Sequence, residues 1–244
     1  MTGVLVVTGG SRGIGAEIAK LAAERGWSVL TTYAERREPA EAVVREIVAK
    51  GGKAATMQAD TGIEADIPRI FDTAEELFGP VTGLVNNAGM NGGPAALMDI
   101  EVAEIRRLLE VNVLGCILCA REAVRRMARS RGGQGGAIVN IGSVAARLGS
   151  ANERVHYSAS KGAILSFTQG FGREVIKEGV RVNCISPGLI NTEMNPIERQ
   201  ARVLPAVPIG RVAEPIEVAR AVLFLLSSEA SYIAGTELTV SGGR

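Results

Sequence analysis

The chain has 244 residues, of which 46% are hydrophobic and 22% charged, and its formal net charge is +1. No linker-like change of composition divides the sequence, so we expect a single domain over residues 1–244, with no charge-driven attraction to nucleic acid or membranes. Three cysteines in this length exclude a disulfide scaffold, and neither a signal peptide nor a membrane span is evident, so we expect a cytoplasmic protein.

Short apolar runs alternate with longer segments of helical periodicity along the whole chain. We expect strands at residues 4–8, 27–32, 54–59, 83–86, 137–141, 180–185 and 237–240. We expect helices at residues 14–24, 38–50, 63–78, 102–129, 157–178 and 216–227. This alternation predicts an α/β fold, a doubly wound parallel sheet with helices on both faces, with ligand at the carboxyl ends of the strands.

The first expected strand runs directly into a glycine-rich turn that opens a helical segment. The residues of this turn that we expect to contact a ligand are Gly9, Ser11, Arg12, Gly13, Ile14 and Gly15. Glycines allow a tight turn and let backbone N–H groups approach a pyrophosphate, while the helix N-terminus adds a partial positive charge. The turn alone is weak evidence, but its position between a strand and a helix predicts dinucleotide binding.

The end of the second expected strand indicates which nicotinamide cofactor is used. An NAD-binding protein usually places Asp or Glu there, whereas the tip of this strand reads Thr31, Thr32, Tyr33 and Ala34, without an acid. Arg12 and the pair Arg36 and Arg37 would bind an extra phosphate on the adenine ribose, unless Glu35 turns inward. We therefore expect NADP(H) to be favoured over NAD(H); the alternative is that Arg36 and Arg37 are only solvated residues at a helix start.

The next two strands also end in polar or small residues. Asp60 and Thr61 follow the third strand, where a carboxylate could accept a hydrogen bond from the adenine amino group. Asn87, Ala88 and Gly89 follow the fourth strand, and their small size would let the cofactor pass closely. Each group alone could be a strand-end cap, but three successive strands of this kind indicate one ligand lying across them.

Residues suited to hydride transfer chemistry follow the fifth strand. Ser143 comes directly after this strand, and Tyr157 and Lys161 share one face of the next helix. Reduction of a ketone needs a proton donor and a group that stabilises the developing oxyanion. A phenol has an ordinary pKa near 10, and an ammonium about 4 Å away would favour its ionised form enough for it to act near neutral pH.

With these residues in this order and spacing, the sequence resembles the short-chain dehydrogenase/reductase family over essentially its whole length. The residues that carry the resemblance are Thr8, Gly9, Gly13, Gly15, Asn86, Asn87, Ala88, Gly89, Asn112, Ser143, Tyr157, Lys161, Pro187, Gly188 and Thr192. The general pattern is that of the 3-oxoacyl-carrier-protein reductase and glucose dehydrogenase branches. The resemblance implies a Rossmann-type sheet of seven strands in the order 3-2-1-4-5-6-7 and a homotetramer.

The resemblance also implies a role for each catalytic residue. Tyr157 would be the acid/base, Ser143 would position the substrate, and Lys161 would also bind the nicotinamide ribose. Asn112 would kink its helix and hold a water molecule that links Lys161 to solvent. The residues expected to line the nicotinamide are Pro187, Gly188, Ile190 and Thr192. No metal ligand is expected.

We therefore expect an NADP-dependent oxidoreductase acting on a carbonyl or secondary alcohol of a small molecule, similar to 3-oxoacyl reductases. A sugar or polyol dehydrogenase is the alternative among enzymes, and a non-catalytic dinucleotide-sensing regulator is the alternative of another class. Nucleic-acid binding is disfavoured because the arginine-rich segment 125–131 lacks interleaved aromatic residues. The substrate would be bounded by segments 145–155 and 189–213, where Asn152, Arg154 and Met194 could reach it or lie on the surface.

Three further features are interpreted as structural. Cys116 and Cys119 form a Cys-x-x-Cys spacing inside an apolar helix, which indicates packing and not metal binding. His156, the only histidine, is expected at a loop or helix start. Ser241 occupies a position where the family commonly has Asp, and this difference concerns packing or assembly near the end of the last strand.

Overall fold

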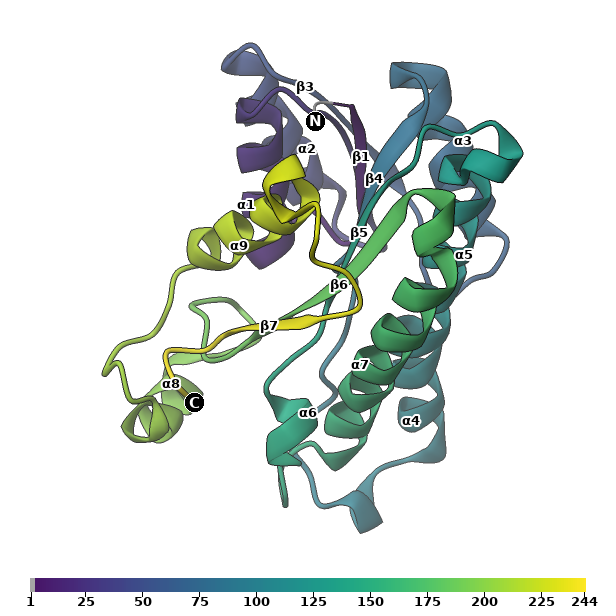
Figure 1. The fold of residues 1–244 in the computed structure, drawn as a ribbon. Coiled ribbons are helices and arrows are strands. Elements are labelled where there is room, and N and C mark those ends of the chain that lie inside the picture. The colour runs from purple at the N-terminus through teal and green to yellow at the C-terminus, as the bar shows by residue number, and fades with distance from the viewer. Residues whose placement is uncertain (1–2) are drawn as a thin grey trace.

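The computed structural model describes residues 3–244, and its strands form one parallel sheet in the order β3-β2-β1-β4-β5-β6-β7 (Figure 1). The strands are β1 (Val4–Val7), β2 (Ser28–Tyr33), β3 (Lys53–Gln58), β4 (Val81–Asn86), β5 (Gly136–Ile141), β6 (Val180–Pro187) and β7 (Glu237–Val240). Both the fold class and the strand order implied by the resemblance are confirmed.

Three of the inner strands are buried along their whole length. Every residue of β1, β5 and β6 is buried, whereas residues of the edge strands β3 and β7 are partly exposed. Both faces of a parallel sheet are covered by helices, so its inner strands are rich in apolar residues such as Val and Ile.

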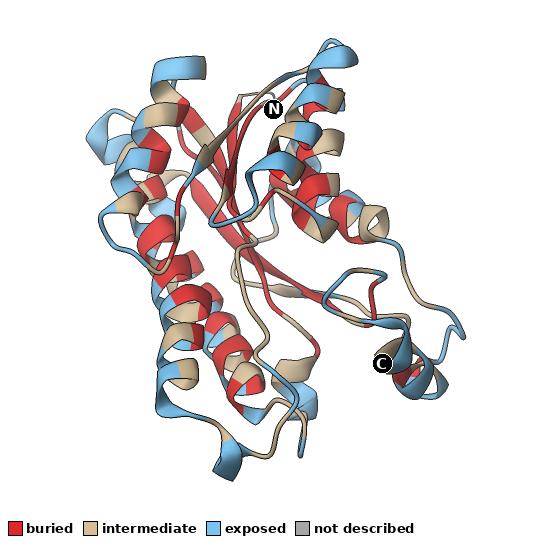
Figure 2. Ribbon diagram, turned by 180° about the vertical axis from the view of Figure 1, so that it is seen from behind, coloured by how far each residue is buried: buried red, intermediate tan, exposed pale blue. Residues whose placement is uncertain are grey.

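The helices form two layers on opposite faces of the sheet, and the buried residues gather between each layer and the strands (Figures 1 and 2). One layer consists of α1 (Gly13–Glu24), α2 (Arg37–Ala49) and α9 (Pro215–Leu226). The opposite layer consists of α3 (Asp66–Phe78), α5 (Cys116–Met127) and α7 (Val155–Val175). The helix α4 (Val102–Leu109) precedes α5 and packs against α7.

The expectation of one continuous helix over residues 102–129 is wrong. The segment 102–129 is divided into α4, a π-helical segment (Glu110–Gly115) and α5. Two short helices were not expected, α6 (Ala145–Leu148) and α8 (Ile197–Val203), and both lie in the segments assigned to substrate binding. The other expected elements agree with the structure to within three residues at each end.

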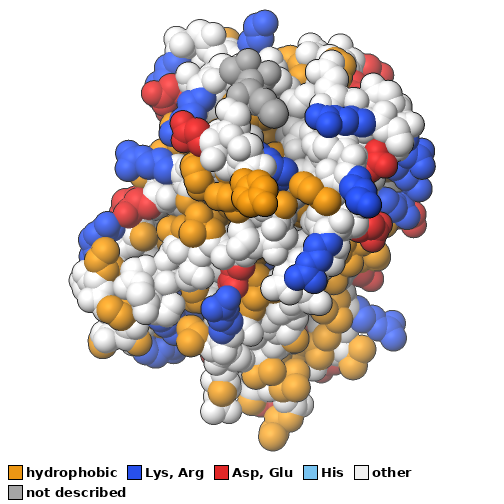
Figure 3. All heavy atoms as spheres, in the orientation of Figure 1, with side chains coloured by type: hydrophobic (Ala, Val, Ile, Leu, Met, Phe, Trp, Pro, Cys, Tyr) orange, Lys and Arg blue, Asp and Glu red, His pale blue; other side chains and the backbone are white. Residues whose placement is uncertain are grey.

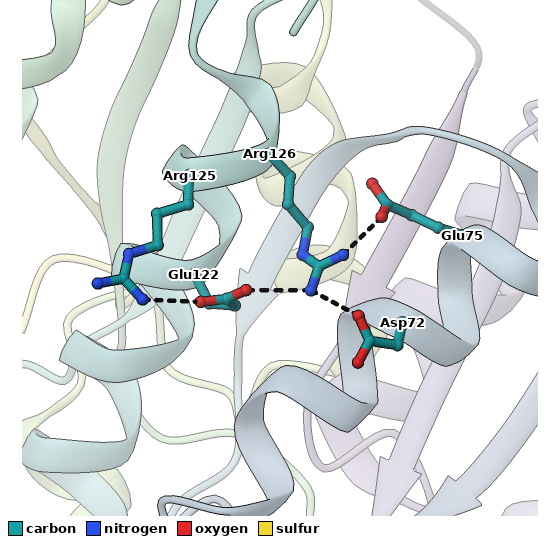
Figure 4. Close-up of polar contacts among 5 residues, drawn as sticks. All are labelled: Asp72, Glu75, Glu122, Arg125 and Arg126. Carbon is teal, nitrogen blue, oxygen red and sulfur yellow. Dashed lines mark hydrogen bonds and ion pairs between the residues drawn. The ribbon is translucent and has the colours of Figure 1, made fainter. Parts of the chain in front are cut away.

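Arg126, from the arginine-rich segment, is partly buried among acidic residues. Its guanidinium pairs with Asp72 at 2.7 Å, Glu75 at 2.5 Å and Glu122 at 3.0 Å, which joins α5 to α3 (Figure 4). On the face drawn in Figure 3, Lys and Arg side chains are interspersed with Asp and Glu. Arg126 therefore stabilises the contact between two helices and does not project toward a polyanion.

None of the helices within residues 3–244 combines the length and the apolar composition needed to cross a bilayer. All three cysteines are free and buried, as expected for packing residues. Burial raises the pKa of the Cys116 thiol to about 12 and that of Cys184 to about 11.

Candidate active site

A cleft of about 760 Å³ lies at the carboxyl ends of the strands, where the loops that follow β1 to β6 meet. All predicted cofactor residues except Gly15 and Arg37 line this cleft. They are Gly9, Ser11, Arg12, Gly13, Ile14, Tyr33, Arg36, Asp60, Thr61, Asn87, Ala88, Gly89, Tyr157, Lys161, Pro187, Gly188, Ile190 and Thr192. Ser143 lines it as well, and Asn112 does not. The cleft lies where doubly wound sheets bind ligands.

The glycine-rich turn is held against β4 by Thr8 and Asn87. The backbone N–H groups of Asn87 and Ala88 donate to Oγ1 of Thr8 at 3.1 and 3.0 Å. The amide Nδ2 of Asn87 donates to the carbonyl oxygens of Thr8 at 3.0 Å and Gly9 at 2.8 Å. A Cβ on Gly15 would lie 2.4 Å from the same amide nitrogen, so Gly15 allows this close packing without facing the cleft.

The N-terminus of α1 has the properties of an anion site. Gly9 and Gly13 have φ angles of +67° and +54°, which the left-handed turn requires and side chains disfavour. The N-cap residue Arg12 makes no side-chain capping bond, and the first turn of α1 holds no acidic residue. The N–H groups and the helix dipole are therefore free to face a phosphate, and this end of the cleft fits a dinucleotide pyrophosphate.

Arg12 and Arg36 converge at the end of the cleft next to β2. Both guanidiniums pair with one oxygen of Glu193, Arg12 at 2.6 Å and Arg36 at 3.1 Å. Arg37 instead pairs with Glu41 on α2 and does not line the cleft. Glu35 does line it, so a carboxylate accompanies the arginines at this end. Glu193 itself was not anticipated from the sequence.

Asp60 is engaged by the protein itself. One carboxylate oxygen pairs with Arg107 of α4, and the other accepts from the backbone N–H of Gly62 at 2.9 Å. Arg107 also lines the cleft and was not anticipated from the sequence. The carboxylate is thereby fixed at the wall of the cleft, beside Thr61.

Ser143, Tyr157 and Lys161 meet on one wall of the cleft. Ser143 follows β5, and its Oγ accepts from the backbone N–H of Ala145 at 3.1 Å. Lys161 is buried, with its Nζ donating to the carbonyl oxygen of Ile141 at 2.7 Å and lying 5.8 Å from the centre of the Tyr157 ring. The ammonium is thus fixed beside the phenol ring on the first two turns of α7.

Asn112 lies behind this wall, in the π-helical segment. Its Oδ1 accepts from the backbone N–H of Met90 and its Nδ2 donates to the Met90 carbonyl, both at 2.8 Å. The same Nδ2 donates to Oγ of Ser160 at 3.1 Å, and that hydroxyl donates to the carbonyl of Tyr157 at 2.7 Å. Asn112 therefore joins the loop after β4 to the first turns of α7.

The loop after β6 approaches the glycine-rich turn. A Cβ on Gly13 would lie 3.3 Å from the Thr192 methyl group, so the two segments are close across the cleft. A Cβ on Gly188 would lie 2.7 Å from Cα of Ser241, which explains the glycine and shows that Ser241 packs at the end of β7.

The far end of the cleft, beyond Tyr157, is lined by charged residues. Arg154, Arg199, Arg244 and Glu153 all line it, together with Met194. Of the residues considered from the sequence, Arg154 and Met194 therefore reach the cleft and Asn152 does not. Arg199 and Arg244 had no sequence signal, because neither belongs to a motif.

His156 is buried at the second residue of α7, where its Nε2 lies 3.8 Å from Glu104. Within residues 3–244, no group of three or more His, Cys, Asp or Glu side chains has the arrangement of a metal site.

Comparison with known proteins gives one consistent family. A family model described as enoyl-(acyl carrier protein) reductase matches residues 9–244. The chain is 43% identical to the uncharacterized oxidoreductase YgfF of Escherichia coli (strain K12), over 99% of each. It is 37% identical to the human 3-oxoacyl-[acyl-carrier-protein] reductase, over 100% of this chain and 98% of that protein. A short-chain dehydrogenase from Burkholderia cenocepacia J2315, solved with NADP, is 36% identical, with a TM-score of 0.91 over 98% of this chain and 96% of that one.

Proposed function

Since the chain belongs to the short-chain dehydrogenase/reductase family, we propose that its cleft transfers a hydride between NADP(H) and the carbonyl or secondary alcohol of a small molecule. It is an oxidoreductase of this family, similar to 3-oxoacyl reductases. The observation that carries the proposal is the meeting of Ser143, Tyr157 and Lys161 on one wall of a cleft that also holds the glycine-rich turn.

The proposed chemistry divides between the cofactor and three side chains. When bound, the nicotinamide supplies or accepts the hydride. Tyr157 donates a proton to the substrate oxygen in reduction and takes it back in oxidation. Ser143 donates a hydrogen bond to the same oxygen and holds it beside the phenol. The buried ammonium of Lys161, 5.8 Å from the ring centre, stabilises negative charge on the phenol oxygen.

Asn112 acts in this proposal as a positioning residue. Through Met90 and Ser160 it fixes the loop after β4 against the turn of α7 that carries Tyr157. A water held near this amide would connect Lys161 to solvent, as the resemblance implies. Gly89 supports such an arrangement, because a Cβ there would lie 3.3 Å from Oδ1 of Asn112 and 3.7 Å from Nζ of Lys161.

We propose NADP(H) as the favoured cofactor over NAD(H). Arg12 and Arg36 lie together at the end of the cleft next to β2, where the adenine ribose is expected. A ribose phosphate would accept from both guanidinium forks, whereas the two ribose hydroxyls of NAD lack that charge. The Burkholderia relative was solved with NADP, which supports the same choice.

The experiment that tests the function uses a panel of ketones and secondary alcohols with each of the two cofactors. We expect turnover with NADPH at a higher kcat/KM than with NADH. Tyr157→Phe deletes only the phenol hydroxyl and should lower kcat by about 10²- to 10⁴-fold, the usual contribution of a general acid. Fluorescence titration should show nearly unchanged NADPH binding, because the ring and its neighbours remain.

Tyr232→Phe is the matched control, since Tyr232 is fully exposed and lies outside the cleft. It should leave turnover unchanged. Retention of more than a tenth of the wild-type kcat by Tyr157→Phe would show that another group moves the proton. A higher kcat/KM with NADH would refute the cofactor preference.

We also propose a homotetramer in the cytoplasm, built from single-domain subunits. The exposed side chains Leu109 and Leu114 at the junction of α4 and α5 are candidates for subunit contact. The partly buried rings of Phe167 and Phe171, stacked at 5.0 Å on α7, are further candidates. Light scattering should give four times the subunit mass of 25.5 kDa. A monomeric mass would contradict the assembly, and recovery in a membrane fraction would contradict the location.

A further inference from the structure

The substrate end of the cleft carries an excess of positive charge. Three arginines, Arg154, Arg199 and Arg244, line it beside a single carboxylate, Glu153. A fourth arginine, Arg202, pairs with the same carboxylate at 2.7 Å from outside the cleft. Among the side chains there, one carboxylate therefore lies near four guanidiniums, an arrangement that favours binding of a further anion.

These arginines differ in how far the protein satisfies them. Arg199 donates to Glu153 at 2.9 Å and to Asn195 at 2.8 Å. The buried Nε of Arg154, in contrast, has no hydrogen-bond partner within the described residues. Burial and the nearby charge of Arg199 lower the pKa of Arg154, whereas Glu153 and Tyr157 oppose that change. Arg154 is thus a half-buried cation without a hydrogen-bonded anion of its own.

The position of Arg154 relates it to the substrate and not to the cofactor. It is the N-cap residue of α7, three positions before Tyr157, and both residues line the cleft. The groups suited to the cofactor phosphates, α1 and the pair Arg12 and Arg36, follow β1 and β2. In the sheet, β1 and β2 lie on the opposite side of β4 from β5 and β6, whose loops carry the catalytic residues.

We propose that the substrate of this enzyme is anionic, a carbonyl compound with a carboxylate or phosphate group that binds Arg154. The inference rests on the proposed function and specifies its substrate class. A guanidinium fork matches either anion and donates to it in paired hydrogen bonds. The positive charges of Arg199 and Arg244 attract the same anion. Once the anion is bound, the carbonyl group of the substrate is positioned next to Tyr157 and Ser143. A neutral substrate would leave the Arg154 charge without a partner.

The test compares matched pairs of substrates with NADPH. 4-Oxopentanoate is paired with its methyl ester, and dihydroxyacetone phosphate with dihydroxyacetone, so the two pairs distinguish a carboxylate from a phosphate. We expect the anionic member of at least one pair to have a roughly 10- to 100-fold higher kcat/KM, the range of a hydrogen bond to a charged group. Arg154→Gln should abolish this advantage, mainly through KM, so that both members of the pair are used with similar kcat/KM. Arg202→Gln removes the same charge outside the cleft and should keep the preference.

A binding measurement tests the inference without turnover. Pentanoate and methylphosphonate carry the two anions but no carbonyl, and calorimetric titration into the enzyme–NADPH complex measures their affinity. Wild type should bind at least one of them and Arg154→Gln should bind neither. The inference would be overturned if wild type showed the same kcat/KM for both members of each pair. It would also be overturned if Arg154→Gln lowered kcat/KM equally for both members. If neutral ketones are reduced in a Tyr157-dependent way and no anionic substrate is preferred, only this inference fails. If no carbonyl compound is reduced, the proposed function fails, and the calorimetric titration still shows whether Arg154 binds an anion.

Discussion

Glu193 places one carboxylate oxygen between the guanidiniums of Arg12 and Arg36, at 2.6 and 3.1 Å. In the proposed complex a ribose phosphate needs the same two forks, so carboxylate and phosphate compete for them. All three side chains are about half exposed or more, and such exposed ion pairs contribute at most about 1 kcal/mol. Glu193 therefore opposes cofactor binding moderately and does not block it.

The variant Glu193→Gln should strengthen NADPH binding because it removes the competing charge and leaves both arginines in place. A change of up to about 1 kcal/mol corresponds to a dissociation constant lowered by up to about fivefold, with NADH binding unchanged. Fluorescence titration of the two reduced cofactors measures both values. Glu198→Gln, an exposed carboxylate on α8 that does not line the cleft, is the control. Weaker NADPH binding, or an equal change for both cofactors, would show that Arg12 and Arg36 do not bind the phosphate.

At this scale the sequence predicted residues that belong to local motifs and missed those defined by distant contacts. Tyr157 and Lys161 were found because one helical turn separates them and their chemistry is complementary. Glu193 and Arg12 are 181 positions apart, and no periodicity or spacing relates them. Arg107 was missed for the same reason, since its partner Asp60 lies in the loop after β3, 47 positions away.

At the scale of the elements, the π-helical segment between α4 and α5 is in close contact with the loop after β3. Gly115 ends this segment, and a Cβ there would lie 2.4 Å from the carbonyl oxygen of Thr61. The loop that carries Asp60 and Thr61 therefore rests directly on the helix backbone. The same segment carries Asn112, so the position of the helix sets both the loop after β3 and the polar contacts behind Tyr157.

Gly115→Ala should destabilise the protein, because the new methyl group meets backbone that must shift. Overpacking of this kind costs about 1–3 kcal/mol, and each kcal/mol lowers Tm by roughly 2–4 °C in a protein of this size. Gly170→Ala is the control, since a Cβ at this exposed position in α7 meets nothing within 4 Å. That substitution should raise stability by about 0.5–1 kcal/mol through helix propensity. Scanning calorimetry measures both, and equal Tm values would contradict the proposed contact.

Element type was predictable from the alternation of apolar runs, whereas the interruption at Asn112 was implied only by the family resemblance. The apolar periodicity of residues 102–129 continues through the π-helical segment, because one wide turn changes the phase without removing apolar residues. The helices α6 and α8 have four and seven residues, too few to establish a 3.6-residue pattern. Both segments were recognised only as loops near the substrate.

At the scale of the whole molecule, segments near the two ends of the chain pack against each other. The helix α9, near the C-terminal end, packs directly on α1, near the N-terminal end, and both share one apolar core with β5 and β6 (Figure 1). The cleft is assembled from loops after six different strands. A ligand that spans this cleft is bound only by the complete fold, so its binding energy stabilises the whole protein against unfolding.

Chemical labelling of the three buried cysteines measures whether the whole protein unfolds cooperatively. Burial raises the pKa of every one of them, to about 12 for Cys116 and about 11 for Cys184, so at pH 8 the thiols are protonated as well as inaccessible. Two lie on α5 and one on β6, so a single cooperative domain should expose them together. We expect iodoacetamide to give chains with no adducts or three by intact mass spectrometry, at a rate set by global unfolding.

NADPH at 100 times its dissociation constant should slow this labelling about 100-fold, equivalent to about 2.7 kcal/mol, because only the folded chain binds it. NADH at the same concentration should slow it less if the ribose phosphate contributes to affinity. Protein unfolded in urea is the control and should be labelled at all three positions without dependence on cofactor. Rapid modification of one cysteine in the native protein would mean that part of the chain opens independently, and that α5 and β6 do not unfold as one unit.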